Sequence, residues 1–172
     1  MDSIVFKKAG IADSQQVHSL TKKAFIAYAH EIRKQGHVDA LSETIEDVDY
    51  DIKHKHVYLC LLDGHLVGAV RFAVLTDGIA YLSRLAIDPD IQSIGIGGLL
   101  LEKAHQECRR LGVKAITLYT ASKKTSSVAF YLKNGYYIHS ITRDKAYIRA
   151  FMVNELKPMD ELFDYESVVG NR

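Results

Sequence analysis

The sequence predicts a mixed α+β domain in which helices flank one sheet that is mostly antiparallel. Three apolar runs lie between residues 56 and 88, separated by Asp63-Gly64 and Asp77-Gly78. Asp-Gly pairs favour tight hairpins because both residues tolerate positive φ. Amphipathic segments with helical spacing lie before and after these runs. The helix after Gly98 must carry the chain from one strand to a neighbouring parallel strand. The sheet is therefore expected to be mixed.

The chain begins with a predicted strand and helix. Residues 3–9 (SIVFKKA) have the composition of a short strand. Asp13 or Ser14 can then cap a helix, because an N-cap oxygen accepts a free backbone N–H of the first turn. We expect this helix to run to about Lys34, before Gly36. Its apolar stripe consists of Val17, Leu20, Ala24, Phe25 and Tyr28.

Residues 37–55 fit either a second, more polar helix or a mixed loop. Ser42 is the candidate cap, but a full capping box needs Glu or Gln three residues later, where Ile45 stands. Such an acidic segment is typical of a solvated face, and the alternative is a surface that attracts a cationic molecule. The five carboxylates of this segment are Glu43, Glu46, Asp47, Asp49 and Asp51.

The hairpin strands are expected at about 56–62, 65–75 and 79–88, ending before Pro89. A helix follows the glycines at 95, 97 and 98, and Gly112 stands where a C′ residue would end it. The positions that this helix is expected to bury are Leu100, Leu101, Ala104, Cys108 and Leu111.

The second half of the chain is expected to complete the same sheet. A buried strand at 113–120 precedes a short helix near 126–134 that Gly135 closes. Two final strands are hinged at Asp144-Lys145. We expect one domain over residues 1–157 and a C-terminal tail over residues 158–172, either flexible or docked on the surface.

The composition is that of an ordinary globular protein, with 48% hydrophobic and 25% charged residues. The formal net charge of +1 gives no overall field that favours nucleic acid or an acidic membrane. No apolar stretch approaches the roughly 20 residues that span a bilayer, and the first residues lack a signal-peptide pattern. Cys60 and Cys108 fit buried thiols in a reducing compartment. We expect a cytoplasmic protein with no nucleic-acid or membrane partner.

The glycines at 95, 97 and 98 need an explanation, because glycine destabilises a helix by about 1 kcal/mol relative to alanine. A P-loop would require Lys-Ser or Lys-Thr after them, and a dinucleotide fingerprint would require glycine where Leu100 stands. A helix that begins on small residues can bind phosphate, since its free N–H groups carry positive partial charge. A diphosphate site and a tight turn without a ligand both fit.

Two motifs resemble those of the GNAT superfamily of N-acetyltransferases. In LAIDPDIQSIGIG, Gln92, Gly95 and Gly97 match the acyl-CoA motif Q/R-x-x-G-x-G/A at the family's distance from Pro89. In SSVAFYLKNGYY, the second motif F/L-Y-x-x-x-G-F/Y is filled by Phe130, Tyr131, Gly135 and Tyr136. The resemblance covers about residues 3–156, and two motifs in order on their expected elements are specific.

The resemblance implies a site for coenzyme A. In the family, the glycine turn and the following helix start hold the pyrophosphate, and the preceding strand splays at a bulge so that its backbone pairs with the pantetheine arm. The residues implied for the pyrophosphate are Gln92, Ser93, Ile94, Gly95, Ile96, Gly97 and Gly98, and those for pantetheine are Leu85, Ala86 and Ile87.

The resemblance also implies the chemistry. Tyr131 would protonate the departing thiolate, a nearly balanced transfer because a phenol has a pKa near 10 and the thiol's is not far below. The backbone N–H of Ile87 would polarise the thioester carbonyl. Some members carry a glutamate base where Tyr81 stands, so a carboxylate base is not expected. Lys124 replaces the asparagine that binds pantetheine in many members.

We therefore expect an acetyl-CoA-dependent N-acetyltransferase that moves an acetyl group directly to a primary amine of a small molecule or peptide. The alternatives are a non-catalytic acyl-CoA-binding sensor or regulatory module, and a nucleotide-binding domain of another fold. Acetyl-CoA is the expected co-substrate. No metal is expected, because His54 and His56 have no third ligand at suitable spacing. The acceptor's identity and the oligomeric state, a homodimer included, stay open.

Overall fold

The structure of the chain is a computed structural model that describes residues 3–34, 37–91 and 94–172. Seven strands form one sheet in the order β1-β2-β3-β4-β5-β7-β6. β4 pairs with β5 in parallel, whereas the pairs β1/β2, β2/β3, β5/β7 and β6/β7 are antiparallel. The mixed α+β class with a mostly antiparallel sheet is confirmed.

The strands and helices follow the predicted order. The strands are β1 (Ile4–Lys8), β2 (His56–Leu62), β3 (His65–Val74), β4 (Ile79–Ile87), β5 (Ala115–Ala121), β6 (Tyr137–Thr142) and β7 (Arg149–Glu155). The α-helices are α1 (Ser14–Glu31), α2 (Ile45–His54), α3 (Ile96–Arg110), α4 (Thr125–Lys133) and α5 (Tyr165–Gly170). Short 3₁₀ turns occupy Ile11–Asp13, Asp39–Ser42, Thr76–Gly78 and Pro89–Ile91.

Contacts divide the chain into two compact units. The first comprises the described residues of Met1–Phe72 and Arg84–His105, and the second comprises Ala73–Ser83 and Gln106–Arg172. The domain over residues 1–157 and the tail over 158–172 remain a prediction.

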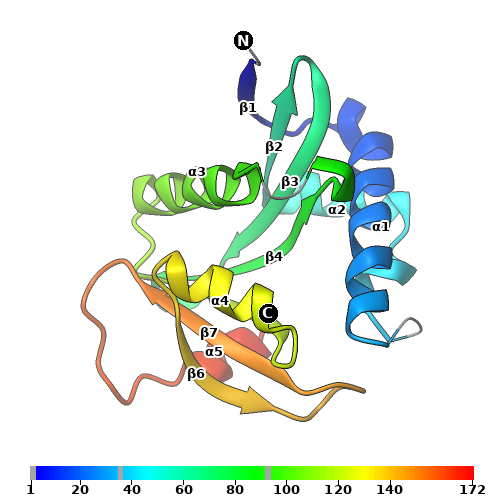
Figure 1. Cartoon of the computed structure of the whole chain (residues 1–172). Coiled ribbons are helices and arrows are strands. Elements are labelled where there is room, and N and C mark those ends of the chain that lie inside the picture. The colour runs from blue at the N-terminus through cyan, green and yellow to red at the C-terminus, as the bar shows by residue number, and fades with distance from the viewer. Residues whose placement is uncertain (1–2, 35–36, 92–93) are drawn as a thin grey trace. The chain divides into compact units, whose positions relative to one another are not determined.

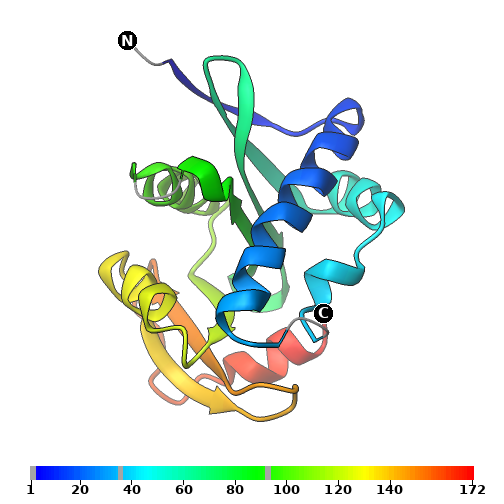
Figure 2. The same cartoon turned by 45° about the vertical axis from the view of Figure 1, so that its right-hand side comes forward.

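In the first unit, helices cover both faces of the strands: α1 and α2 lie on one side and α3 on the other (Figures 1 and 2). The side chains of consecutive β3 residues point to opposite faces of the sheet, because side chains alternate along a strand. Ala69 packs with Val17 of α1 and Val48 of α2. Gly68 faces α3, where a Cβ would lie 2.9 Å from Ile87 Cδ1 and 3.1 Å from Leu100 Cδ2. Glycine at this position therefore lets α3 approach β3 closely.

Both Asp-Gly pairs form turns with positive φ, as predicted. Asp63 and Gly64 have φ of 49° and 81° between β2 and β3. Asp77 and Gly78 have φ of 59° and 74° between β3 and β4. The two turns therefore connect β2, β3 and β4 in succession, with no α-helix between them.

The start and end of α1 differ from the prediction. Asp13 stands at the N-cap position, but its carboxylate accepts from the Gly10 backbone N–H and from Lys7 Nζ, each at 2.8 Å, instead of from the helix. The helix ends at Glu31, short of the predicted Lys34.

The predicted Ser42 cap of α2 is wrong. Thr44 caps the helix, accepting from the Asp47 backbone N–H at 3.2 Å, while the Asp47 carboxylate accepts from the Thr44 N–H at 2.9 Å. Aspartate at this position replaces the glutamate that usually completes a capping box. The Ser42 hydroxyl donates to the Asp39 carbonyl instead.

In the second unit, α4 and α5 lie on opposite sides of β5 and β7 (Figure 1). Gly112 (φ 76°) and Gly135 (φ 94°) follow α3 and α4 in left-handed conformations, as predicted for helix ends. Leu111 was expected to be buried but is 38% exposed, because α3 ends one residue before it. One core cluster joins α5 to the strands and consists of Ile79, Ala115, Phe151, Val153, Tyr165 and Val169.

The two cysteines are free and buried, as predicted. Burial raises the pKa of the Cys108 thiol to about 12, so this group stays protonated at neutral pH.

Candidate active site

The residues implied for the pyrophosphate lie between β4 and the first turn of α3. Ile94 and Gly95 precede the helix, whereas Ile96, Gly97 and Gly98 form its first turn. Gln92 and Ser93 lie outside the described residues.

The backbone at this turn suits an anion. Gly95 has φ of 88°, a conformation that a residue with a Cβ adopts at a cost. A Cβ added to Gly95 or to Gly98 would meet nothing within 4 Å, so neither glycine is required to avoid a clash within the protein. The free N–H groups at the start of a 15-residue helix supply positive partial charge beside this open space. These residues therefore fit a phosphate group.

The residues implied for pantetheine form the end of β4. Ala86 is buried, whereas Leu85 and Ile87 are half-buried. Arg84, directly before them, has φ of 52°, and it is the one non-glycine residue in a described strand with positive φ. A left-handed residue within a strand breaks the alternation of side chains, as at a β-bulge. Such a conformation costs about 1–3 kcal/mol and is concentrated at functional sites.

An ion-pair cluster joins the segment after β4 to α1. Lys23 Nζ lies 2.7 Å from Asp88 Oδ1 and 2.7 Å from Asp90 Oδ2. The hydrogen bond from Lys23, together with the Asp90 backbone N–H, lowers the pKa of the Asp88 carboxyl. Both aspartates flank Pro89, so Lys23 helps to fix the path of the chain towards the glycines.

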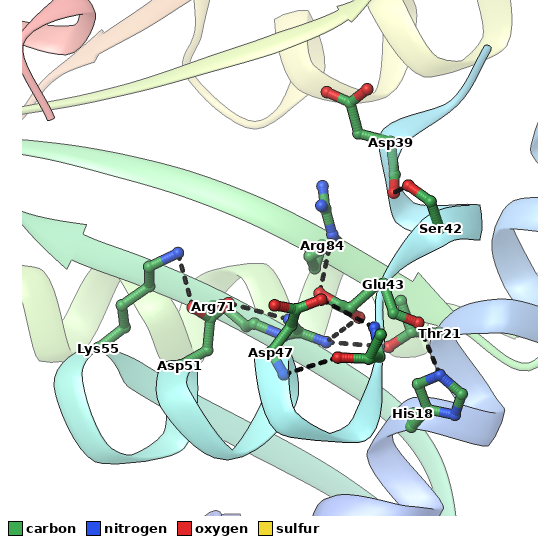
Figure 3. A network of polar contacts seen from close by, with 11 residues as sticks. His18, Thr21, Asp39, Ser42, Glu43, Asp47, Asp51, Lys55, Arg71 and Arg84 are labelled. Carbon is green, nitrogen blue, oxygen red and sulfur yellow. Dashed lines mark hydrogen bonds and ion pairs between the residues drawn. The ribbon is translucent and has the colours of Figure 1, made fainter.

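A buried arginine on β3 organises much of the first unit (Figure 3). Arg71 is 0% exposed, and it shares the face of Ala69 that packs on α1 and α2. Its Nη1 donates to Glu43 Oε1 at 2.6 Å and its Nη2 donates to Glu43 Oε2 at 3.0 Å, which makes a bidentate ion pair. Nη1 also donates to Asp51 Oδ2 at 2.9 Å, and Nη2 to Thr21 Oγ1 at 3.3 Å. The carboxylates raise the pKa of Arg71 although burial alone would lower it.

The acidic segment is therefore mainly an internal structure. Glu43 and Asp51 bind Arg71, and Asp51 also binds Lys55 at 2.8 Å. Asp47 closes the capping box described above, and Asp49 accepts from the Ser14 hydroxyl. Glu46 is exposed. The interpretation as a solvated face therefore holds for Glu46 and Asp47 and is wrong for Glu43 and Asp51. Most of these carboxylates bind groups of the protein itself, which removes the main argument for a surface that attracts a cationic molecule.

Neither of the two family motifs indicates Arg71. Arg71 can be noticed in the sequence because it is a charged residue inside the apolar run LVGAVRFAVL. Such an arginine either faces solvent or is buried against carboxylate partners. Residues 43 and 51 then supplied the candidate partners, but only the fold brings them together.

Tyr131 lies on α4, in the second unit. The ring is half-buried and packs edge-on against Phe130 and Tyr136, at centroid distances of 5.2 and 5.5 Å. Burial raises the pKa of the neighbouring Tyr136 well above its usual value, so that phenol remains protonated. Tyr131 is thus held on a helix by aromatic contacts that leave part of it accessible.

Two further positions from the motif comparison are also in the second unit. Tyr81, which stands in place of a glutamate, packs against Tyr119 at 6.1 Å, and the Arg172 guanidinium lies 4.2 Å from its ring centre. Lys124, in place of an asparagine, occupies the N-cap position of α4 and donates to Ser126 Oγ at 3.1 Å.

Within residues 3–34, 37–91 and 94–172, no three His, Cys, Asp or Glu side chains are grouped as metal ligands. Each helix of this described part falls short of the length or the apolar character that a bilayer crossing requires.

Comparison with known proteins agrees with the two motifs. The uncharacterized protein YxbD of Bacillus subtilis (strain 168) is 36% identical over 74 residues, which are 43% of this chain and 45% of that protein. A mycothiol acetyltransferase of Geodermatophilus obscurus is 35% identical over 57 residues, 33% of this chain and 18% of that protein. The matched segments thus span less than half of either relative.

The fold agrees as well. A PaiA N-acetyltransferase of Thermoplasma acidophilum, solved in complex with coenzyme A, superposes with a TM-score of 0.77 at 19% identity, covering 89% of this chain and 99% of that one. The family model described as "Acetyltransferase (GNAT) family" matches residues 24–136, a range that includes the turn at Gly95 and Tyr131. The chain belongs to the acetyltransferase (GNAT) family, as its two motifs predicted.

Proposed function

We propose that this protein is an acetyl-CoA-dependent N-acetyltransferase that transfers the acetyl group directly to a primary amine. The observation that carries this proposal is the open, left-handed glycine turn at the start of α3, within a family whose members transfer acetyl groups. The coenzyme A complex of the PaiA enzyme supports the same co-substrate.

The residues of β4 and α3 would bind the co-substrate. The backbone N–H groups of residues 94–98 would donate to the diphosphate, and those of residues 85–87 would pair with the pantetheine arm. The Ile87 N–H would donate to the thioester oxygen and stabilise the negative charge that develops on it. Lys124, Ser126 or Ser127, at the start of α4, would take the place of the family's missing asparagine.

The transfer itself needs one acid and a neutral amine. The amine nitrogen would bond to the carbonyl carbon as the carbon–sulfur bond breaks, and the Tyr131 hydroxyl would give its proton to the departing thiolate. The proton lost by the amine would return to Tyr131 through water. Because Tyr81 carries no carboxylate, the amine would enter already neutral or lose its proton to water.

A thiol-release assay tests the proposal. The purified chain is incubated with acetyl-CoA and a panel of amines that includes amino acids, amino-acid amides, polyamines and peptides with free N-termini. We expect free coenzyme A and an equimolar acetylated amine for at least one class. Calorimetry runs alongside and should show binding of coenzyme A but not of ATP or NAD.

The two alternatives predict different results in these measurements. Tight binding of coenzyme A without thiol release on any amine would replace the enzyme by a sensor or regulatory module. Binding of ATP or NAD in preference to coenzyme A would point to a nucleotide-binding domain and overturn the proposal.

A further inference from the structure

Arg84 is a constrained and incompletely paired cation. Its Nε lies 3.4 Å from Glu43 Oε1, its side chain is 27% exposed, and its backbone has φ of 52°. Nη1 and Nη2 have no hydrogen-bond or ion-pair partner within the described part of the chain. Figure 3 shows these two nitrogens pointing away from Glu43. The N–H groups of Nη1 and Nη2 can therefore donate hydrogen bonds to a group outside the protein.

The anchor of Arg84 is itself held rigidly. Glu43 is bound at both carboxylate oxygens by the fully buried Arg71, and its backbone carbonyl lies 2.8 Å from His18 Nε2. A carboxylate fixed in this way orients the Arg84 side chain through Nε. Less side-chain entropy is then lost when the free end of Arg84 binds a ligand.

The charges of the network around Arg84 balance one another. The network contains two carboxylates, Glu43 and Asp51, and three cations, Lys55, Arg71 and Arg84. Asp47 is engaged in the cap of α2; hydrogen bonds from Thr44 lower its pKa most, and the charges of Arg84 and Arg71 contribute less. With Asp47 the network has three carboxylates and three cations. Of its two part-exposed cations, Lys55 is paired with Asp51 at 2.8 Å, whereas the terminal nitrogens of Arg84 point away from Glu43.

The position of Arg84 connects it to the proposed reaction. It directly precedes residues 85–87, and three residues of strand span about 10 Å. The backbone of Arg84 therefore lies within about 10 Å of the backbone proposed to hold the thioester, a separation comparable to the length of a small molecule.

We propose that Arg84 binds a carboxylate of the acceptor, so that the acceptor is an amine that also carries a carboxylate, as an amino acid does. This inference rests on the proposed acetyltransferase function and names its substrate class. A guanidinium binds a planar carboxylate through two parallel hydrogen bonds, which adds geometric selection to charge attraction. Arg84 is a specificity-determining residue in this role and takes no part in bond breaking.

A matched pair of variants tests the role of Arg84. Arg84→Gln removes the charge and keeps most of the side-chain length. Arg33→Gln makes the same change at an exposed arginine whose φ of 56° matches that of Arg84, so it controls for backbone strain. Each variant is assayed with L-amino acids and with the corresponding amino-acid amides, which lack the carboxylate.

The expected pattern is selective. The native protein should acetylate amino acids in preference to their amides. Arg84→Gln should raise KM for amino acids about 10- to 100-fold, as expected for a lost charge-assisted pair. The amide reaction and the thermal midpoint should change little, and Arg33→Gln should match the native protein. Arg84→Lys keeps the charge but lacks the planar pair of donors, so its KM for amino acids should lie between those of the native protein and Arg84→Gln.

Other outcomes separate this inference from the proposed function. If amides are acetylated as well as acids, or if Arg84→Gln affects both equally, the carboxylate contact is wrong while the acetyltransferase stands. If no amine releases thiol, the acetyltransferase proposal fails, and calorimetry with an N-acetyl amino acid in the presence of coenzyme A decides the role of Arg84. Binding that weakens at least 10-fold in Arg84→Gln would keep the carboxylate site, and absent or unchanged binding would overturn it.

Discussion

Replacing the buried arginine of β3 should cost a large part of the protein's stability. Arg71→Met keeps a side chain of similar length but removes the guanidinium that pairs with Glu43 and Asp51. Asp51 would retain Lys55 at 2.8 Å, whereas Glu43, 6% exposed, would keep only the Arg84 contact at 3.4 Å among its ion pairs. One carboxylate is thereby left buried and poorly compensated. Breaking a buried pair in this way costs about 3–5 kcal/mol.

This loss is measurable because a domain is stable by only about 5–15 kcal/mol in total. For a chain of this length, each kcal/mol lowers the thermal midpoint by about 2–4 °C, so the midpoint should fall by roughly 6–20 °C. Urea unfolding at pH 7, followed by circular dichroism, gives the change in unfolding free energy directly. Glu46→Gln is the control: it removes an exposed carboxylate of the same segment and should change stability by less than about 0.5 kcal/mol.

A double variant tests whether the stranded carboxylate is the cause. Adding Glu43→Leu to Arg71→Met removes that carboxylate and should recover at least about 2 kcal/mol, since apolar replacements of buried ion pairs are often neutral or better. A single Arg71→Met variant within about 1 kcal/mol of the native protein would refute the reasoning. So would a double variant that is less stable than the single one.

Three further results are expected. Tyr131→Phe keeps the ring, so coenzyme A binding should persist while the single-turnover acetyl-transfer rate falls by roughly 100-fold; a native rate would remove Tyr131 from the mechanism. Gly97→Val, in the first turn of α3, should weaken coenzyme A binding by about 2 kcal/mol or more in calorimetry without unfolding the chain, and unchanged affinity would count against the phosphate site. Because the hydrogen bond from Lys23 lowers the pKa of Asp88 in the folded state, its contribution to stability is present above the ordinary value of 3.8 and is lost as pH falls towards the lower folded value. Asp88→Asn should therefore flatten the loss of unfolding free energy between about pH 5 and pH 2, and an unchanged slope would argue against this pair.

The sequence predicted most of the fold because its local signals agree with one another. Asp-Gly pairs placed both turns from β2 to β4, and glycines at 112 and 135 marked the ends of α3 and α4. The parallel pairing of β4 with β5 followed from the helix between them. These features depend on a few neighbouring residues, which is why periodicity and turn chemistry suffice for them.

The missed features depend on residues far apart in the chain. Arg71 looks like a break in an apolar strand until Glu43 and Asp51 are known to lie against it. The cap of α2 was missed for a more local reason, since Asp47 replaces the glutamate that the usual motif requires. The family motifs indicated Tyr131 and the glycine turn. Strand alternation also indicated that Arg84 either reaches the site or lies along the surface, but its positive φ and its contact with Glu43 could be seen only in the structure.

The Arg71 network also sets an expectation for how related sequences diverge. An apolar residue at position 71 would remove the arginine that both carboxylates share, leaving Glu43 with only the Arg84 contact and Asp51 with only Lys55. An arginine without carboxylates at 43 and 51 would be equally costly. Substitutions at these three positions should therefore occur together across relatives, with apolar sets replacing the charged set as a whole. Position 46, which has no part in the network, should vary independently of them. The network would then appear in an alignment as a covarying triplet drawn from the loop before α2, from α2 and from β3.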